Sequence, residues 1–287
     1  MKITITGATG LLGRAATQHL ADAGHEITAV DRVDGEVPAG VKLVLGDLTD
    51  LDFTDSVISG ADAVVHLGAI PSPRDERQYF VFRNNCDSTF AVFSAAVHAK
   101  VKVVAYASSQ SIYGTAWSDD WYSPQYLPID EKHPLVYQES YALTKEVNEL
   151  SAQMFARRGK TAFVGFRFPL THDIERIQQY AEEFRSGEDE RVKYLAKICF
   201  SYLDRRDAAK ALELAVTSDI TGANVFVFSA PDSFSYMPTD ETFKKWHPTT
   251  ELRGDFSGFQ SPFTSQKFID RFGYKPQHLL DRSKMQG

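Results

Sequence analysis

Short apolar runs alternate with segments of helical periodicity from residue 2 to residue 169. The first run, Lys2–Thr6, is rich in β-branched side chains, and apolar residues then recur at helical spacing from Leu11 to Ala23. Buried parallel strands read as continuous apolar runs of this length, with amphipathic helices between them. Further runs of this kind occur at residues 26–30, 41–45, 63–67, 101–107 and 161–166. The pattern predicts an α/β fold with a doubly wound parallel sheet.

The regular alternation ends near Pro169, and a mixed region follows it. Residues 225–228 form one more apolar run, which is expected to return to the main sheet as a strand. The helices expected in this region lie at residues 174–185, from Asp204 to Val216, near Thr239 and just before Gly273. We therefore predict a sheet domain over residues 1–169 and a smaller, discontinuous lobe over residues 170–287.

The composition is that of an ordinary globular protein and limits the possible partners. Of the 287 residues, 43% are hydrophobic and 24% are charged. The net charge of −7 argues against nucleic-acid binding, because phosphate binding needs a basic surface. No apolar run approaches the roughly 20 residues of a membrane-spanning helix, and the N-terminus reads as a strand instead of a signal peptide. We expect a cytoplasmic protein with no membrane partner.

The first apolar run leads directly into a glycine-rich turn, Gly7-Ala-Thr-Gly10-Leu-Leu-Gly13. A strand followed by such a turn and a helix is the context of a dinucleotide-binding fingerprint. There Gly7 permits the tight turn, Gly10 lets the backbone approach a pyrophosphate, and Gly13 lets the helix pack on the strand. The turn therefore indicates a Rossmann-like domain that binds a nicotinamide dinucleotide.

The end of the second apolar run indicates which dinucleotide is bound. Asp31 stands there, and a carboxylate at this position can accept hydrogen bonds from both ribose hydroxyls and repel a 2′-phosphate. This favours NAD over NADP. The neighbouring Arg32 keeps NADP open, because an arginine can attract that phosphate.

The ends of the next strands are candidate ligand contacts, because ligands of a parallel sheet bind at the carboxyl ends of its strands. Asp47 and Leu48 follow the third run and are expected to flank the adenine, although Asp47 could equally cap a helix. Gly68 and Ala69 follow the fourth run. Asn85 lies inside the long helix predicted at residues 79–100, where it is expected to hydrogen-bond to backbone.

Other residues that often carry chemistry have a structural interpretation here. Cys86 and Cys199 lie far apart in apolar settings and are expected to be buried free thiols. His66 lies within an apolar strand, where a hydrogen-bonded core histidine is expected more often than a ligand. No metal site is therefore predicted.

Tyr141 and Lys145 lie four residues apart in a predicted helix and share one of its faces. A Lys ammonium there can stabilise the phenolate and lower a tyrosine pKa that is about 10 when unperturbed. The tyrosine then becomes usable as an acid or base near neutral pH. Ser108, Ser109 and Ser111 follow the fifth run, and they are either turn residues or donors to a substrate oxygen beside the tyrosine.

Residues 115–136 are unusually aromatic and acidic for a connection between a strand and a helix. They include Trp117, Trp121, Asp130 and Glu131. Two interpretations stay open. The segment is a loop that packs its rings over the sheet edge, or a lid whose rings stack on a sugar and whose carboxylates bind hydroxyls.

In this order, these features resemble the extended short-chain dehydrogenase/reductase family, the NAD-dependent epimerase/dehydratase group, over roughly residues 1–230. The resemblance implies bound NAD(H), with Tyr141 as the acid/base and Lys145 holding the nicotinamide ribose. It also implies a Ser or Thr that orients the substrate oxygen. Counting back from Tyr113-Gly114, Ser109 matches that position, with Ser108 and Ser111 as alternatives.

The glycine turn, the strand ends and the resemblance together predict three sets of residues, with an NAD-binding domain at 1–169 and a substrate-binding lobe at 170–287. The catalytic set is Tyr141, Lys145 and Ser109. The substrate set is Ser109, Gln110, Ser111 and Arg167. The cofactor set is Gly7, Thr9, Gly10, Leu11, Leu12, Gly13, Asp31, Arg32, Asp47, Leu48, Leu67, Gly68, Ala69, Asn85, Ala107, Ser108, Tyr141, Lys145, Phe168 and Pro169.

Two departures from the family pattern narrow the expected chemistry. Where the dehydratases resemble one another in an Asp-Glu pair, this chain has Gln110-Ser111, so sugar dehydration is not expected. Many sugar-nucleotide members carry an Asn and a Tyr-Gly-Pro-like turn where this chain has Arg167-Phe168-Pro169, and the C-terminal lobe is short. Both facts favour a smaller substrate, such as a free sugar, a uronate or a polyol. Arg167 or Arg206 could bind a substrate anion, although surface or structural salt bridges explain either arginine at least as well.

The prediction is an NAD-dependent oxidoreductase that transfers a hydride from a hydroxyl-bearing carbon of a sugar-like substrate. A nucleotide-sugar (UDP-sugar) 4-epimerase is the alternative among enzymes. A non-catalytic cofactor-sensing protein is the alternative from another class, although such a protein would not need Tyr141, Lys145 and Ser109 together. The resemblance also suggests a homodimer formed through the helices at 79–100 and 137–158.

Overall fold

A seven-stranded parallel sheet forms the centre of the structure, a computed structural model that describes residues 1–73, 77–186 and 190–285. The strand order is β10-β7-β5-β4-β1-β2-β3. This confirms the predicted α/β fold with a doubly wound parallel sheet. The strands are β1 (Lys2–Thr6), β2 (Glu26–Asp31), β3 (Lys42–Leu45), β4 (Ala63–His66), β5 (Val103–Ala107), β7 (Ala162–Arg167) and β10 (Ala223–Val227).

The central strands are buried on both faces, which explains their continuous apolar sequences. In the pairing of β1 with β4, Ile5 lies opposite Val65, and both side chains are fully buried. The next pairing, β4 with β5, sets Val65 opposite the equally buried Ala105. The strands β4 and β5 show no regular apolar–polar alternation, because neither face meets water, and the polar positions of β1, Thr4 and Thr6, are buried as well.

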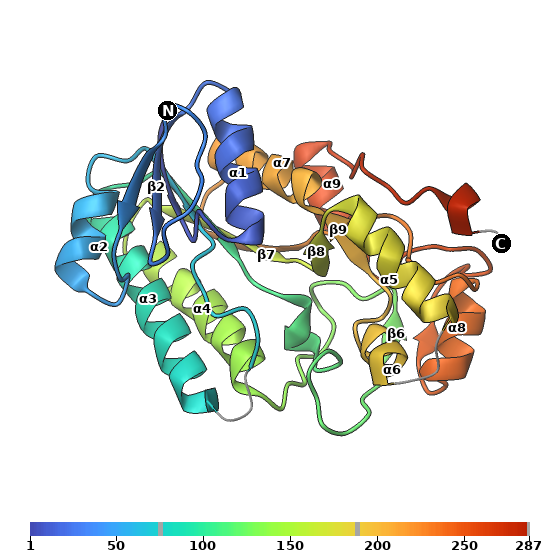
Figure 1. Ribbon diagram of the computed structural model, residues 1–287. Coiled ribbons are helices and arrows are strands. Elements are labelled where there is room, and N and C mark those ends of the chain that lie inside the picture. The colour runs from blue at the N-terminus through green and yellow to red at the C-terminus, as the bar shows by residue number, and fades with distance from the viewer. Residues whose placement is uncertain (74–76, 187–189, 286–287) are drawn as a thin grey trace.

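Helices cover both faces of the sheet (Figure 1). On one face α1 (Leu11–Asp22) packs against α7 (Arg205–Val216), and their apolar residues join the core cluster beneath them. On the other face lie α2 (Leu51–Ile58), α3 (Gln78–His98) and α4 (Ser140–Ala156). The layer order is therefore helix, sheet, helix.

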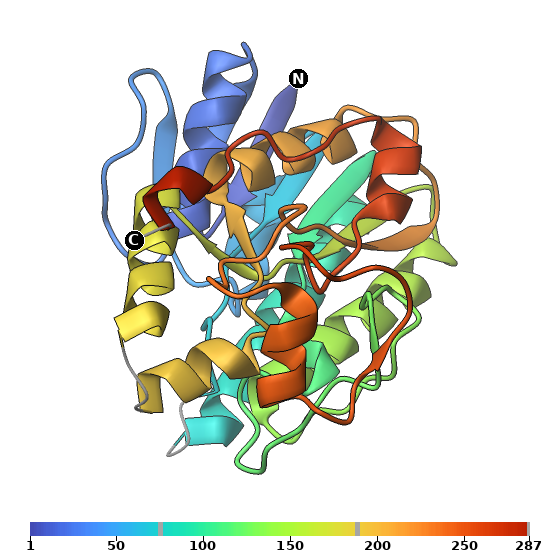
Figure 2. The same ribbon diagram turned by 90° about the vertical axis from the view of Figure 1, so that its right-hand side faces the viewer.

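A smaller lobe lies beside the carboxyl ends of the strands and holds its own apolar cluster. Its helices pack around buried aromatic rings that include Phe184, Phe200 and Phe234. Figure 2 shows the C-terminal segment crossing α7 and ending beside α5, and Leu280 from that segment belongs to the same cluster. The elements of this region are β6 (Tyr126–Leu127), β8 (Leu170–His172), α5 (Ile174–Ser186), α6 (Glu190–Lys197), β9 (Tyr202–Asp204), α8 (Thr239–Trp246) and β11 (Glu251–Leu252).

The helices predicted beyond Pro169 are present. The Asp204 carboxylate caps α7 by accepting a hydrogen bond from the Arg206 backbone N–H. The helix α9 (Gln266–Phe272) ends at Gly273, whose φ of 68° is a left-handed conformation that favours glycine. However, α7 and β10 belong to the sheet layers, so the lobe boundary at residue 169 stays a prediction.

The aromatic segment at residues 115–136 packs its tryptophan rings onto the smaller lobe, and Glu131 reaches the edge strand β10 of the sheet. The Trp121 ring stacks on Trp246, and its indole Nε1–H donates to the Trp246 carbonyl at 2.9 Å. Asp130 and Glu131 accept hydrogen bonds within the protein, from the Tyr126 hydroxyl and the Val227 N–H. These two carboxylates are therefore structural.

Within the described residues, no helix is both long and apolar enough to cross a membrane.

Candidate active site

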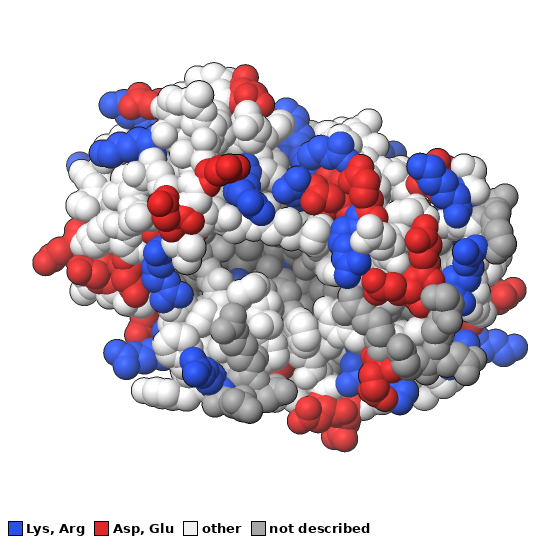
Figure 3. Space-filling view, in the orientation of Figure 1, with Lys and Arg blue, Asp and Glu red and all other residues white. Residues whose placement is uncertain are grey.

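A cavity of about 450 Å³ lies at the carboxyl ends of the central strands, facing the smaller lobe. The sheet order reverses beside β1, and ligands of doubly wound sheets bind at this point. Figure 3 shows the surface hollowed there, with charges of both signs scattered around the hollow. Of the predicted residues, the cavity is lined by Gly7, Gly10, Leu11, Leu12, Gly13, Leu67, Ala69, Ala107, Ser108, Ser109, Gln110, Ser111, Tyr141, Lys145, Phe168 and Pro169.

A second cavity, of about 390 Å³, continues the first toward β2 and β3. The two cavities share the glycine turn and the end of β4, so they form one groove across the strand ends. Its further predicted lining residues are Thr9, Asp31, Arg32, Asp47, Leu48 and Gly68. Among the predicted residues, all of which lie in the described chain, Asn85 and Arg167 line neither cavity.

The glycine turn has the close backbone packing that the fingerprint requires. A Cβ built on Gly13 would lie 1.9 Å from the Gly7 carbonyl oxygen, and Gly7 itself has a φ of 68°. No side chain caps the N-terminus of α1 at Gly10. The first N–H groups of the helix are therefore available to an anion such as a pyrophosphate.

The Asp31 carboxylate is oriented at the end of β2. It accepts hydrogen bonds from the backbone N–H groups of Thr9, at 3.0 Å, and Arg32, at 2.7 Å. The Arg32 guanidinium lies 3.6 Å from the Asp47 carboxylate and also donates to Asn84. The arginine that kept NADP open is thus balanced by a second carboxylate.

Asn85 does not line the groove, but its side chain hydrogen-bonds to the backbone beside it. Its side-chain amide accepts from the Ile70 N–H at 2.8 Å and donates to the Ile70 carbonyl at 3.0 Å. This pair of bonds fixes the chain directly after Gly68 and Ala69. The predicted hydrogen bonds from Asn85 to backbone are present, and they hold the chain segment that lines the groove in place.

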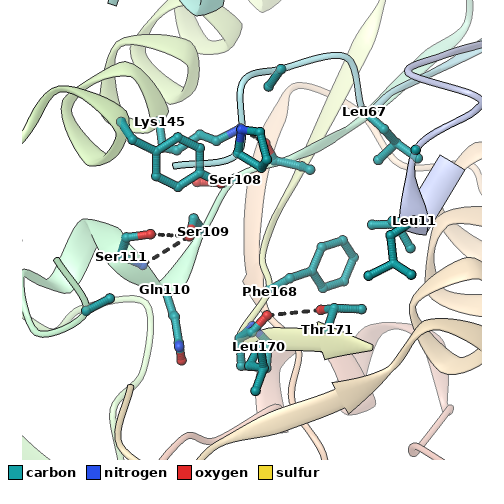
Figure 4. A pocket seen from close by; sticks show the side chains of 18 of the residues that line it. Leu11, Leu67, Ser108, Ser109, Gln110, Ser111, Lys145, Phe168, Leu170 and Thr171 are labelled. Carbon is teal, nitrogen blue, oxygen red and sulfur yellow. Dashed lines mark hydrogen bonds between the residues drawn. The ribbon is translucent and has the colours of Figure 1, made fainter. Parts of the chain in front are cut away.

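Tyr141, Lys145 and Ser109 converge in the larger cavity. The Lys145 ammonium lies 5.2 Å from the Tyr141 ring centroid and donates to the Ala107 carbonyl at 2.8 Å. Ser109 hydrogen-bonds the Tyr141 phenol. Figure 4 shows Lys145 and Ser109 on one side of the cavity and Leu11 and Leu67 on the other.

The pKa values of this group differ from the expectation. Burial raises the pKa of Tyr141 to about 12, which outweighs the lowering by the Ser109 hydrogen bond. Burial also lowers the pKa of Lys145 to about 8. These groups alone therefore do not lower the tyrosine pKa, because the loss of hydration exceeds the effect of Ser109, and the Glu139 and Tyr194 side chains raise the pKa further.

Arg167 does not take the substrate-binding role predicted for it. Its guanidinium forms a buried ion pair with Glu149, at 2.6 Å, and donates to the Tyr113 hydroxyl at 3.1 Å. The same glutamate accepts a hydrogen bond from the Ser108 hydroxyl at 2.6 Å. Arg167 and Ser108 are thus bound to the protein. Of the three candidate serines, Ser109 faces the tyrosine, and Ser111 is hydrogen-bonded to Ser109.

The histidine and the cysteines have the structural roles expected of them. His66 is bonded to the Thr6 and Thr89 hydroxyls, at 2.7 and 3.0 Å. Burial lowers the pKa of His66 to about 3, so the ring is neutral at neutral pH. Cys86 and Cys199 are free thiols, of which Cys199 is buried as expected and Cys86 is only partly buried. In the part of the chain described, no group of three or more His, Cys, Asp or Glu side chains could hold a metal ion.

Several lining residues were not predicted from the sequence. Most of them come from the aromatic segment, from β8 and from α6, while Pro71 follows β4 and Ile198 follows α6. Of these residues, only Trp117 was assigned a possible binding role from the sequence, as part of a lid. Neither β8 nor α6 was predicted as an element, so nothing connected their residues with the glycine turn. The unpredicted lining residues are Pro71, Ala116, Trp117, Leu170, Thr171, His172, Tyr194 and Ile198.

The chain belongs to the NAD dependent epimerase/dehydratase family, whose sequence model matches residues 3–218. The predicted family is thereby confirmed. The chain is accordingly an enzyme that uses NAD, and the non-catalytic alternative is not favoured.

Full-length relatives catalyse two different reactions. L-arabinose 1-dehydrogenase (NAD(P)(+)) of Haloferax volcanii is 24% identical over 250 residues, 85% of this chain and 93% of that enzyme. UDP-glucose 4-epimerase of Corynebacterium glutamicum is 24% identical over 312 residues, 97% of this chain and 92% of that enzyme. Among solved structures, a short-chain dehydrogenase/reductase superfamily protein from Agrobacterium tumefaciens with bound NAD superposes with a TM-score of 0.73. It is 21% identical, over 99% of this chain and 94% of that chain, and confirms the fold.

Proposed function

We propose that the protein is an NAD-dependent dehydrogenase that oxidises a hydroxyl-bearing carbon of a sugar-like substrate. Tyr141 is the acid/base, Ser109 orients the reacting oxygen, and Lys145 places its charge beside both. The observation that carries the proposal is the convergence of these three side chains in the groove that begins at the glycine turn. The full-length likeness to an L-arabinose dehydrogenase supports a sugar substrate.

The groove fits an extended dinucleotide. The N-terminus of α1 would hold the pyrophosphate, Asp31 would hold the adenosine ribose, and Asp47 and Leu48 would flank the adenine. Lys145 and Tyr141 would hold the nicotinamide ribose. When bound, NAD⁺ accepts a hydride and places positive charge beside the tyrosine.

The residues divide the oxidation into a proton path and a hydride path. Ser109 donates a hydrogen bond to the substrate hydroxyl oxygen and holds it against the Tyr141 phenolate. Tyr141 removes the hydroxyl proton, and bound NAD⁺ would accept the hydrogen on the same carbon as a hydride. The carbon–oxygen single bond becomes a carbonyl, and the two electrons leave with the hydride.

Reduction of NAD⁺ tests the proposal. The wild-type protein would be mixed with NAD⁺ and a panel of free sugars, uronates, polyols and UDP-sugars, and reduced nicotinamide would be followed by absorbance. We expect net reduction with a free sugar, and Tyr141→Phe should lower kcat/KM by about 100-fold or more while NAD⁺ binding persists. Net reduction that survives in Tyr141→Phe would refute the assigned acid/base.

A UDP-sugar 4-epimerase is the second candidate. The relative from Corynebacterium glutamicum, which spans nearly the whole chain, favours it. The same three residues would serve, provided that the keto intermediate stays bound and takes the hydride back on its other face. Inversion of a UDP-sugar without net NAD⁺ reduction would establish this alternative. Dehydration remains unexpected, because Gln110 and Ser111 supply no carboxylate.

We also propose a homodimer formed through α3 and α4. These helices lie side by side, and each exposes a large apolar side chain: Phe90 is 49% exposed and Leu150 is 54% exposed. Exposed apolar side chains that cluster on one face are typical of protein interfaces.

A further inference from the structure

Two aromatic side chains from separate elements wall the substrate end of the larger cavity. Trp117 comes from the segment after β5, and Tyr194 comes from α6 in the smaller lobe. Their ring centroids lie 5.3 Å apart with the planes inclined at 43°. Tyr194 is close enough to Tyr141 for its phenol to raise the pKa of that residue. The aromatic pair therefore stands next to the catalytic tyrosine.

The described lining of this cavity carries almost no charge. Lys145 and His172 are its only residues that can be cationic, and none is Asp or Glu. The Lys145 ammonium is bonded to the Ala107 carbonyl. His172 accepts a hydrogen bond from the Asp173 N–H at its Nδ1, and burial lowers its pKa, so it is neutral at neutral pH. Apart from the N-terminus of α1, which is assigned to the cofactor pyrophosphate, nothing in this described lining is built to bind a phosphate or a carboxylate.

The buried side-chain amide of Gln110 gives the cavity an uncharged hydrogen-bonding group. Gln110 is 5% exposed and lines the cavity directly after Ser109 (Figure 4). The Ser201 hydroxyl donates to its carbonyl oxygen at 2.9 Å. This bond fixes the amide and leaves its nitrogen to donate to a substrate hydroxyl.

Three arginines line a groove that lies next to the larger cavity. That groove shares Leu11 and His172 with the cavity and contains Arg14, Arg205 and Arg206. Two of the three are paired with carboxylates: Arg205 with Asp173 and Arg206 with Asp204. An anionic substituent that extended there would have to compete with those pairs.

We propose that the substrate is an uncharged monosaccharide without a nucleotide, whose apolar face packs on Trp117 and Tyr194 and whose hydroxyl is read by Gln110. The inference rests on the proposed function and specifies its substrate class. One face of a pyranose or furanose ring presents C–H groups, which pack on aromatic rings, while its edge presents hydroxyls to polar groups. The cavity must also hold the nicotinamide and its ribose, which leaves room for one sugar ring.

A matched set of substrates tests the charge requirement. The neutral sugars are L-arabinose, D-galactose and D-glucose, and the charged ones are D-galacturonate, D-glucose 6-phosphate and UDP-glucose. NAD⁺ reduction would be measured with each compound, and its binding to the NAD⁺-loaded Tyr141→Phe variant would be measured by calorimetry. We expect kcat/KM for the best neutral sugar to exceed that of every charged compound by at least about 100-fold.

Two variants test the aromatic wall. Trp117→Leu and Tyr194→Leu should each raise the KM for the neutral sugar by about tenfold or more, with the KM for NAD⁺ within about twofold of wild type. Trp121→Leu is the control, because Trp121 belongs to the same segment but stacks on Trp246 outside the cavity lining. It should leave the sugar KM unchanged.

The outcomes separate this inference from the proposed function. Oxidation of a uronate, a sugar phosphate or a UDP-sugar in preference to every neutral sugar would overturn the inference and leave the dehydrogenase standing. Binding of a neutral sugar without any NAD⁺ reduction would overturn the dehydrogenase and support the inference. Equal effects of Trp121→Leu and Trp117→Leu would overturn the aromatic wall, and absence of both turnover and binding would overturn both proposals.

Discussion

At the scale of single residues, the site holds a balance between burial and charge. Burial raises the pKa of Tyr141 to about 12 and lowers that of Lys145 to about 8, so neither residue is ready for base catalysis at neutral pH by itself. A positive charge placed beside the phenol would shift the balance toward phenolate. The site therefore needs the cofactor both to accept the hydride and to favour the phenolate form of Tyr141 by its positive charge.

The pH dependence of the reaction follows from this balance. Below the pKa of Tyr141 the phenolate fraction rises about tenfold per pH unit, so kcat/KM at saturating NAD⁺ should rise with pH from about 6 to 8. The rise should flatten above about pH 8, because Lys145 loses its proton there. A steady-state pH profile measures both features. A flat profile between about pH 6 and 8 would contradict the role of the phenol.

The residues found from the sequence are those whose partners are local. Gly7 and Gly13 belong to one turn, and Tyr141 and Lys145 to one helical face, so spacing alone relates them. Arg167 was assigned a substrate role because its partner, Glu149, lies on another element and no local pattern connects the two. Tyr194 escaped prediction for the same reason, whereas Trp117 was named from the sequence as part of a possible lid.

At the scale of elements, α4 ties the site to the sheet. Tyr141, Lys145 and Glu149 follow one another at four-residue intervals and so share a face. Lys145 bonds to the end of β5 and Glu149 to Arg167 on β7, both through buried contacts. The helix is thus fixed to two neighbouring strands at the point where the chemistry is proposed.

The buried pair predicts a large effect on stability. Both side chains are 6% exposed, so Glu149→Gln would leave the Arg167 charge buried and unpaired, at a cost of about 3–5 kcal/mol in the free energy of unfolding. Urea denaturation measures this cost. The control is Asp87→Asn, which removes an exposed i,i+4 pair with Arg83 and should cost less than about 1 kcal/mol. Similar losses in the two variants would contradict the account.

Elements differ in how far the sequence predicted them. The long helices α3 and α4 were found because their helical period persists over many residues, and the buried strands were found as short apolar runs. The strands β6, β8, β9 and β11 have two or three residues each, too few to show a period. The apolar run that begins at Ile198 is also broken, because Cys199 and Phe200 have φ values of 55° and 52°, so β9 starts only at Tyr202.

At the scale of the molecule, the chain beyond Pro169 contributes to both the sheet domain and the smaller lobe. It supplies α7 and β10 to the sheet layers, and it supplies the wall of the substrate cavity. A fully buried carboxylate, Asp207, holds the C-terminal segment against α7 by accepting hydrogen bonds from the Tyr274 hydroxyl and from the Gln277 and His278 N–H groups. These long-range contacts explain why sequence patterns predicted the sheet domain better than the lobe.

The proposed dimer makes a prediction at the same scale. The wild-type protein should have a mass in solution of twice the 32.1 kDa of one chain. Phe90→Glu combined with Leu150→Glu should give the monomer mass, because the carboxylates would be buried without partners at the interface. Light scattering after size exclusion measures both. Leu252→Glu, on an exposed apolar residue of β11, is the control and should remain dimeric. A wild-type monomer would refute the proposal.

The central claim is net hydride transfer from a sugar carbon to NAD⁺, and isotope transfer tests it most directly. The protein would be incubated with NAD⁺ and L-arabinose carrying deuterium on every carbon, and the products would be analysed by mass spectrometry. The account predicts one deuterium in each reduced nicotinamide formed, matched by one oxidised sugar, and loss of both in Tyr141→Phe. Conversion of L-arabinose that leaves the nicotinamide oxidised and unlabelled would contradict the claim. Epimerisation of a deuterated UDP-sugar with no label in the nicotinamide would contradict it as well.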